Sequence, residues 1–251
     1  MVLEAAGETN KLNQGYPMNI EQRGDATVDG LTTPKKLDDC LEIVVSWIER
    51  NFGKSYFVRP LDSFQAKFGK VNPEDDFYQS RMNYFLEYCV LEFPMDARPA
   101  SKAPVSKFFE VHKNLTSGND AASAIWRDFC GFRHSLFQVL RSGHDVIFVR
   151  DLVANKTIKI QSKAGETLKY LGKKSIFQGF IFGHHDLYSL GQGLIMHPSL
   201  ANAAILRYMR QHCRFPRFTS GEIARSMAQT NMRYLRMQHV NPAVIYHSIS
   251  G

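Results

Sequence analysis

The chain has 251 residues, of which 44% are hydrophobic and 22% charged, and it carries a formal net charge of +7. This composition is typical of an ordinary globular protein whose core needs neither disulfides nor a structural metal, so it excludes the disordered and disulfide-rich classes. No apolar run approaches the length of about 18 residues that a membrane span requires, and the N-terminal stretch lacks the basic start and apolar centre of a secretory signal. Together with four widely spaced cysteines (40, 89, 130 and 213), these features predict a cytoplasmic protein with free thiols and no membrane partner.

The positive charge lies mainly toward the C-terminal end. Residues 1–133 carry 16 basic and 19 acidic side chains, a net charge of −3, and residues 134–197 carry 8 and 4, a net charge of +4. Residues 198–251 carry 7 and 1, a net charge of +6, and all seven cations are arginines. Charge asymmetry bears on partners rather than on fold, so the C-terminal region is the part that points to function.

Residues 1–33 are polar, contain four glycines and show no sustained periodicity, which predicts a flexible arm. Residues 34–133 predict a helical domain. Its first helix should begin at Pro34 with Thr33 as N-cap and end before Gly53, and its second should follow Asn72-Pro73 and continue to Pro94. Shorter helices are expected over about 61–68, 104–116 and 119–130.

Residues 134–197 predict a small β module. Short stretches of β-rich sequence, separated by polar turns, are expected to form strands over about 136–140, 146–152, 157–160, 175–183 and 187–190, with a last strand ending at Met196. So many short strands in about sixty residues indicate a small antiparallel barrel or curled sheet. Gly179, inside an aromatic strand, predicts a bulge or a barrel corner.

Residues 198–251 predict C-terminal helices, and the fold class is therefore α+β. One helix should run from Pro198 to about Cys213. A second should begin at Thr219, where Thr219 and Glu222 have the spacing of a capping box, and end at Asn241-Pro242. The apolar tail that follows is expected to form a strand or a docking segment.

The order of these elements resembles a group of bacterial proteins without an assigned activity. The resemblance covers about residues 80–200 and is carried by the aromatic helix RMNYFLEYCVLEFPMD, by IWRDFCGFRHSLFQVL, and by DVIFVRDLVANKTIKI with its Asp151-Leu152 pair. In that group a helical region precedes a β module, and some members carry a cysteine-rich SEC-C zinc motif. This chain lacks the C-x-C of that motif, so the resemblance implies the architecture but neither zinc nor an activity.

Few residues suggest chemistry. The histidines of His184-His185-Asp186 and His197 would need to converge to hold a metal, but neighbouring strand residues point to opposite faces, so we expect no metal. Asp151, which follows Arg150, is expected to cap the next turn rather than to act in catalysis. Cys130 and His134 lack a third group to orient them, and no phosphate-binding loop or hydrolase motif is present. The sequence predicts no catalytic residue and no cofactor, and hence no enzyme.

The arginine-rich end is the serious candidate for a binding surface. Its expected members, on two helices, are Arg207, Arg210, Arg225, Arg233 and Arg236. Arginine favours two-bonded contacts with phosphate or carboxylate groups. The stretch FTSGEIARSMAQTNMRYLRM also partly matches a helix-turn-helix in which Thr230-Asn231 would start a recognition helix, although Ala228 stands where a glycine is expected.

Three functions remain open from the sequence. The first is a non-enzymatic cytoplasmic interaction or adaptor protein that binds a protein partner through these arginines. The second is a nucleic-acid-binding protein, and the third is a sensor of an anionic nucleotide. Arginines paired with Glu42, Glu49 or Asp75 of the acidic N-terminal part would instead be structural.

Overall fold

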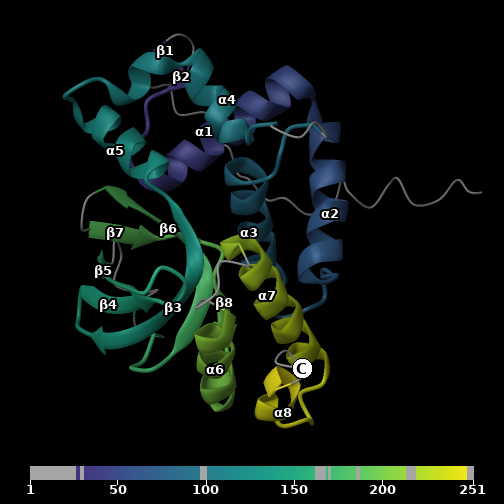
Figure 1. Ribbon diagram of the computed structural model, residues 1–251. Coiled ribbons are helices and arrows are strands. Elements are labelled where there is room, and N and C mark those ends of the chain that lie inside the picture. Colours follow the sequence, from purple (N-terminus) through teal and green to yellow (C-terminus); the bar gives the residue numbers. More distant parts are fainter. Residues whose placement is uncertain are drawn as a thin grey trace, which may run out of the picture. The chain divides into compact units, whose positions relative to one another are not determined.

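The computed structural model describes residues 27–28, 31–96, 101–161, 168, 171–184, 187–212 and 219–247. Residues 1–33 and residues 34–251 form separate units. In the first, strand β1 (Thr27–Val28) pairs antiparallel with β2 (Leu31–Thr32), and the rest of the predicted arm lies outside the described residues. Everything below concerns residues 34–251, in which helices precede and follow a barrel, so the predicted α+β class is confirmed (Figure 1).

The N-terminal helices form where the sequence predicts them, with two shifted starts. They are α1 (Leu37–Phe52), the 3-10 turn η1 (Lys54–Phe57), α2 (Val58–Phe68), α3 (Tyr78–Leu91), α4 (Pro104–Val111), the 3-10 turn η2 (Lys113–Thr116) and α5 (Ala121–Cys130). The predicted start of α1 at Pro34 is wrong, because the Asp39 carboxylate accepts the N–H groups of Lys35 and Lys36 and begins the helix one turn later. Gly53 ends it as predicted, with a φ of 76°.

Helix α3 begins at Tyr78 rather than just after Pro73, because the acidic run before it forms a turn. The Asp75 carboxylate accepts the backbone N–H of Asn72 at 2.8 Å and so caps that turn. From Tyr78 onward α3 is buried on several sides: α2 packs on it through Phe64 and Phe68, whose rings lie 5.9 and 5.5 Å from that of Tyr84. Helix α3 also contacts the barrel through β6 and β8.

The β module is a five-stranded barrel with one added strand. Its strands are β3 (Arg133–Ser142), β4 (Val146–Asp151), β5 (Lys156–Gln161), β6 (Ile176–His184), β7 (Leu187–Leu190) and β8 (Ile195–His197). Pairing runs β3-β4-β5-β7-β6 and closes where β6 pairs with β3, while β8 pairs with the first three residues of β6. The prediction of an antiparallel barrel is wrong for one pair of strands, because β5 and β7 pair in parallel (Figure 1).

Of the bulge and the barrel corner predicted as alternatives at Gly179, the bulge is absent. Register runs through Gly179 without interruption, opposite Ser135, and the irregularity falls in β3 between Val139 and Arg141. Gly179 instead provides space, since a Cβ there would lie 2.8 Å from the Leu194 side chain. A glycine in a strand can mark a close approach as well as a bulge or a barrel corner.

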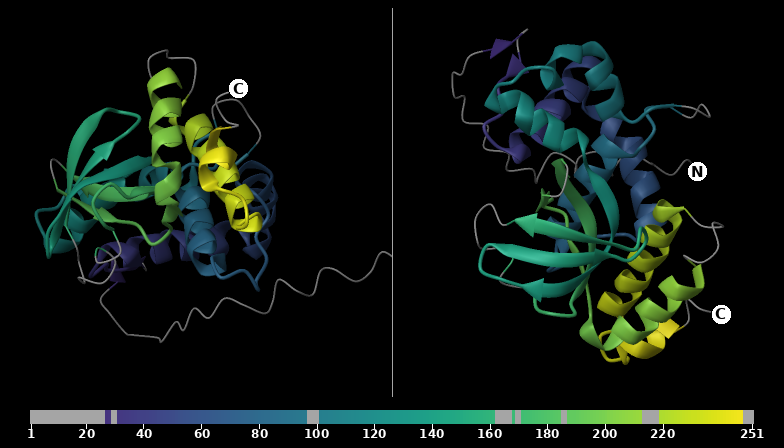
Figure 2. Two further views of the ribbon diagram at one scale, coloured as in Figure 1. Left: turned by 90° about the horizontal axis from the view of Figure 1, so that it is seen from below. Right: turned by 60° about the vertical axis from the view of Figure 1, so that its left-hand side comes forward.

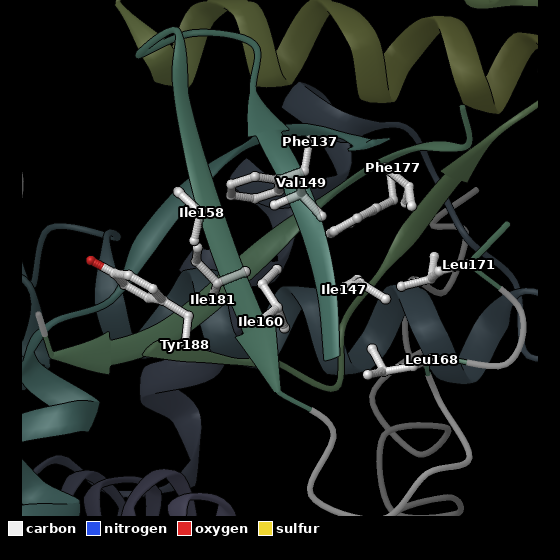
Figure 3. Packing of buried hydrophobic residues seen from close by; sticks show 11 residues of the cluster. Phe137, Ile147, Val149, Ile158, Ile160, Leu168, Leu171, Phe177, Ile181 and Tyr188 are labelled. Carbon is white, nitrogen blue, oxygen red and sulfur yellow. The ribbon is translucent and has the colours of Figure 1, made fainter. Parts of the chain in front are cut away.

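Two hydrophobic clusters lie on the two faces of the barrel wall. The interior, drawn in Figure 3, is filled by side chains of alternate strand positions, among them Phe137, Val149, Ile160, Phe177 and Ile181. The outer face of β3 and β6 contributes Leu136 and Ile176 to a second cluster, which the C-terminal helices complete. This alternation between faces follows from the two-residue period of strands.

The C-terminal helices cover that outer face. They are the 3-10 turn η4 (Ser199–Ala201), α6 (Asn202–His212), α7 (Ser220–Arg236) and α8 (Pro242–His247). The predicted capping box is confirmed: Thr219 Oγ1 accepts from the Glu222 N–H at 3.2 Å, and Glu222 accepts from the Thr219 N–H at 2.7 Å. Helix α7 ends at Arg236, and the tail is a helix rather than a strand (Figure 2). In the described residues no helix is both long and apolar enough to cross a membrane.

Candidate functional site

The five predicted arginines lie on two helices with different neighbours. Arg207 and Arg210 are exposed on α6, which packs against α8. Arg207 Nη1 lies 3.0 Å from His247 Nε2 of α8, and Arg210 donates from Nε to the Leu206 carbonyl at 3.2 Å. Because guanidinium only donates, the His247 nitrogen is the acceptor in the first contact.

The other three lie on α7, whose opposite face is buried. Arg233 is exposed and Arg225 is half-buried. Arg225 lies on the side of α7 that packs against α2, and burial, followed by the Arg225 charge, lowers the pKa of Lys67. The positive charges of Lys67 and Arg225 therefore lie near each other at the α2–α7 contact, whereas Arg207 contacts α8.

Arg236 is not available as a binding residue. Its Nη1 and Nη2 lie 2.8 and 2.7 Å from Oδ1 and Oδ2 of Asp75, a two-bonded ion pair, and its guanidinium carbon lies 5.7 Å from the centre of the Phe77 ring. The Asp75 side chain is 9% exposed. Of the five predicted residues, Arg236 is the one for which the structure shows an ion pair, and its role is to fasten the end of α7 to the turn before α3.

The partial helix-turn-helix match is wrong in its geometry. Helix α7 runs without interruption through Ala228, so no turn separates a second helix. Thr230 and Asn231, which would have started the recognition helix, are 3% and 2% exposed. Alanine favours continued helix where a glycine would have allowed a turn, and this explains the outcome.

The other candidates from the sequence have structural roles where they lie among the described residues. His197 is 5% exposed on β8, its Nδ1 lies 2.8 Å from the Tyr246 hydroxyl, and burial lowers its pKa to about 3. His185 and Asp186 lie outside the described residues. Among the residues that are described, no three His, Cys, Asp or Glu side chains are grouped so as to hold a metal ion. Asp151 caps the next turn as predicted, with Oδ1 accepting from Val153 and Ala154 N–H groups at 2.9 and 3.0 Å.

A series of hydrogen-bonded polar side chains, the buried polar chain, lies between α3 and the barrel, and the sequence did not predict it. Gln178 Nε2 lies 2.6 Å from the Tyr84 hydroxyl, which lies 2.5 Å from His134 Nε2, and His134 Nδ1 lies 2.9 Å from a Glu92 carboxylate oxygen. Each group in this order has a donor for the next, so the chain is complete with His134 protonated on Nδ1. No spacing in the sequence relates these residues, which come from α3 and its C-cap and from the two strands β3 and β6.

The hydrogen-bonded side chains of Glu92, His134 and Tyr84 have the order acid, histidine, hydroxyl of a nucleophilic triad. The Tyr84 hydroxyl, however, cannot reach a substrate. Tyr84 is fully buried, and its burial raises the pKa of the phenol well above the ordinary value. A nucleophile needs both access and a base that can take its proton. The arrangement therefore connects α3 to β3 and β6 and does not form an active site.

A second buried contact joins α3 to α7. Arg81 is 2% exposed, and its Nη2 donates to Asn231 Oδ1 at 2.5 Å. Asn231 in turn donates to the Met196 carbonyl of β8 at 2.8 Å, and burial lowers the Arg81 pKa to about 10. This explains why a polar residue lies on the inner face of α7.

A third contact binds the loop before β8 to α3. Glu87 is 1% exposed and accepts the Gln192 N–H at 2.7 Å, and burial raises its pKa to about 8. A Cβ on Gly193 would lie 2.2 Å from the Tyr84 backbone nitrogen, so the loop rests directly on the helix. Helix α3 thereby holds β8, which leads into the C-terminal helices and their arginines.

The arginines thus stand on a firmly held support, and four of them lie outside any ion pair that the structure shows. No protein-family model, curated protein or solved structure matches this chain.

Proposed function

We propose that this chain is a non-enzymatic cytoplasmic interaction protein that binds an acidic protein partner through the arginines of α6 and α7. The observation that carries the proposal is the charge of the C-terminal helices. The described residues of this region, 198–212 and 219–247, contain a single carboxylate, that of Glu222. It accepts the backbone N–H of Thr219 in the capping box. Arg207, Arg210 and Arg233 are exposed on the same helices.

The support beneath these residues favours a binding role. Helix α6 buries Ile205, Tyr208 and Met209 against the barrel, and α7 buries Ile223 and Met227 in the same cluster. The backbone of a packed helix needs no further ordering when a partner binds, so only the arginine side chains lose freedom on recognition. The buried thiol of Cys89 forms no disulfide, which agrees with a reducing compartment.

The proposal is tested by quantitative co-purification from the organism's own extract with matched variants. The triple variant Arg207→Glu/Arg210→Glu/Arg233→Glu removes the surface, and Lys156→Glu/Lys159→Glu/Lys173→Glu changes three exposed lysines outside the C-terminal helices by the same charge. We expect a defined partner to be retained by the wild type and by the lysine variant and lost by the arginine variant. Equal retention by all three would contradict the proposal.

Binding to nucleic acid is the competing function, and a salt titration separates the two. Neutralising several phosphates makes affinity fall about a thousandfold or more between about 50 and 200 mM salt. We expect no binding of a fluorescent DNA duplex at the upper end of that range. Tight duplex binding that falls steeply with salt and is lost in the arginine variant would replace the protein-partner proposal with the nucleic-acid one.

A further inference from the structure

The outer side of α6 and α8 combines the most exposed aliphatic side chains of the described residues with two arginines. Leu200 of η4 is 68% exposed and Val244 of α8 is 62% exposed, more than any other large hydrophobic residue that the structure describes. Single exposed aliphatic residues are common, but two near two arginines for which the structure shows no ion pair form a surface of defined character.

The contact between Arg207 and His247 joins these residues into one face. Leu200 precedes Arg207 by seven positions along the continuous η4–α6 segment, so both lie on the same side of it. Val244 precedes His247 by three positions on α8 and likewise shares a side with it. Because Arg207 Nη1 lies 3.0 Å from His247 Nε2, the two sides meet edge to edge.

The two helices lie side by side in Figure 1 and in the right-hand view of Figure 2, in agreement with their packing. We call this surface the α6/α8 face and define it by its exposed members Leu200, Ala203, Arg207, Arg210, Val244 and His247. Its position is fixed from behind, because Ile205 and Tyr246, both fully buried, belong to one hydrophobic cluster.

The chemistry of this face selects one kind of partner. Arg207 and Arg210 can bind carboxylates. Burial of Leu200 and Val244 is favourable only against apolar side chains of a partner. A DNA duplex offers phosphates and few apolar groups at its backbone, and the contacts that position a protein on it are polar. A segment of protein with acidic and aliphatic residues satisfies both halves of the face.

We propose that the α6/α8 face binds an acidic segment of a partner protein, whose aliphatic side chains pack on Leu200 and Val244 while its carboxylates pair with Arg207 and Arg210. This inference rests on the proposed function and narrows it to one face. Arg225 and Arg233, both on α7, lie outside the α6/α8 face.

The test uses the full chain and two labelled helical peptides, followed by fluorescence anisotropy. One peptide has a stripe of leucines flanked by glutamates, and in the other serines replace the leucines. We expect the wild type to bind the leucine peptide about tenfold or more tightly than the serine peptide, as the burial of two aliphatic side chains implies.

Three variants assign the binding to the face. Leu200→Ser/Val244→Ser should lose the preference for the leucine peptide, and Arg207→Glu/Arg210→Glu should weaken binding of both peptides. Val111→Ser is the matched control, since Val111 of α4 is 57% exposed and lies outside the face. It should bind as the wild type does, and circular dichroism should show all variants folded.

The outcomes distinguish failure of this inference from failure of the proposed function, which is the binding of an acidic protein partner. Undiminished preference for leucine in Leu200→Ser/Val244→Ser overturns the inference. Loss of peptide binding in Arg225→Glu/Arg233→Glu but not in the α6 variant also overturns it, yet leaves the proposed function standing. Binding to neither peptide together with tight, salt-sensitive binding to a DNA duplex overturns both. Binding only to phosphatidylserine vesicles likewise overturns both.

Discussion

Arg236, at the end of α7, holds both carboxylate oxygens of Asp75, although 161 positions separate the two residues in the chain. The pair links the C-terminal helices to the acidic turn before α3. It also assigns Arg236 a structural role and so leaves the binding surface to the other arginines.

The Arg236–Asp75 pair should contribute measurably to stability. Charge-assisted, two-bonded contacts with a mostly buried partner are worth more than ordinary surface pairs, so Arg236→Ala should lower the free energy of unfolding by about 1–2 kcal/mol. Arg236→Lys keeps the positive charge but cannot form the two-bonded contact with the carboxylate, so it should lose part of the same stability. Urea denaturation measures both. Arg233→Ala, on the exposed side of the same helix, should change stability by less than about 0.5 kcal/mol, and an equal loss in that variant would refute the assignment.

Glu87 should make stability depend on pH in an unusual direction. Its pKa is raised from 4.5 to about 8 by burial, so the folded chain binds a proton that the unfolded chain has released throughout the interval between these values. Stability from this group is therefore fully present below about pH 4.5 and is lost as the pH rises toward 8.

Comparison with Glu87→Gln isolates this effect, because the other titrating groups are common to both proteins. The stability of the wild type relative to the variant should fall between pH 5 and pH 8, as followed by urea midpoints at a series of pH values. A constant difference across that range would show that Glu87 titrates normally.

Gly193 should tolerate no side chain. Gly193→Ala places a Cβ 2.2 Å from the Tyr84 backbone, so the loop must move off α3, and we expect a loss of about 3 kcal/mol or more. Gly221→Ala is the control, because its Cβ would have nothing closer than 4.0 Å in the first turn of α7. That change should be neutral or slightly stabilising. Similar thermal midpoints for the two variants would contradict the close approach.

The buried polar chain fixes the tautomer of His134. With its Nε2 accepting from Tyr84 and its Nδ1 donating to Glu92, neutral His134 should carry its proton on Nδ1, which long-range proton–nitrogen spectra can assign. Tyr84→Phe leaves His134 Nε2 without this donor and should cost about 1–3 kcal/mol. The opposite tautomer in the wild type would leave Nδ1 without a proton to donate to the Glu92 carboxylate and would contradict this order of hydrogen bonds.

The sequence predicted what depends on neighbours in the chain. Thr219 and Glu222 are three positions apart, and their capping box is present as expected. The strands also appear close to their expected bounds, because their alternation is local. Contacts between distant residues left no such signal: the parallel pairing of β5 with β7, and the hydrogen bond of Arg81 to Asn231 across 150 positions, arise only when the barrel closes.

The candidate site shows the same division. The sequence identified the five arginines on two helices but assigned all of them to one binding surface. The structure divides them by their neighbours: Asp75 occupies Arg236, Arg225 is half-buried beside α2, and Arg233 remains exposed. Neither Leu200 nor Val244 stood out, since exposure of an aliphatic side chain is decided by packing and not by sequence period.

The most direct test of the binding surface is to map it by amide chemical shifts on the isotope-labelled full chain during titration with the leucine-and-glutamate peptide. We predict that the shifts concentrate on η4, α6 and α8, around Leu200, Arg207, Arg210 and Val244, and leave the α2–α7 contact unchanged. Shifts confined to the residues around Lys67 and Arg225, or spread evenly over the protein, would contradict the account.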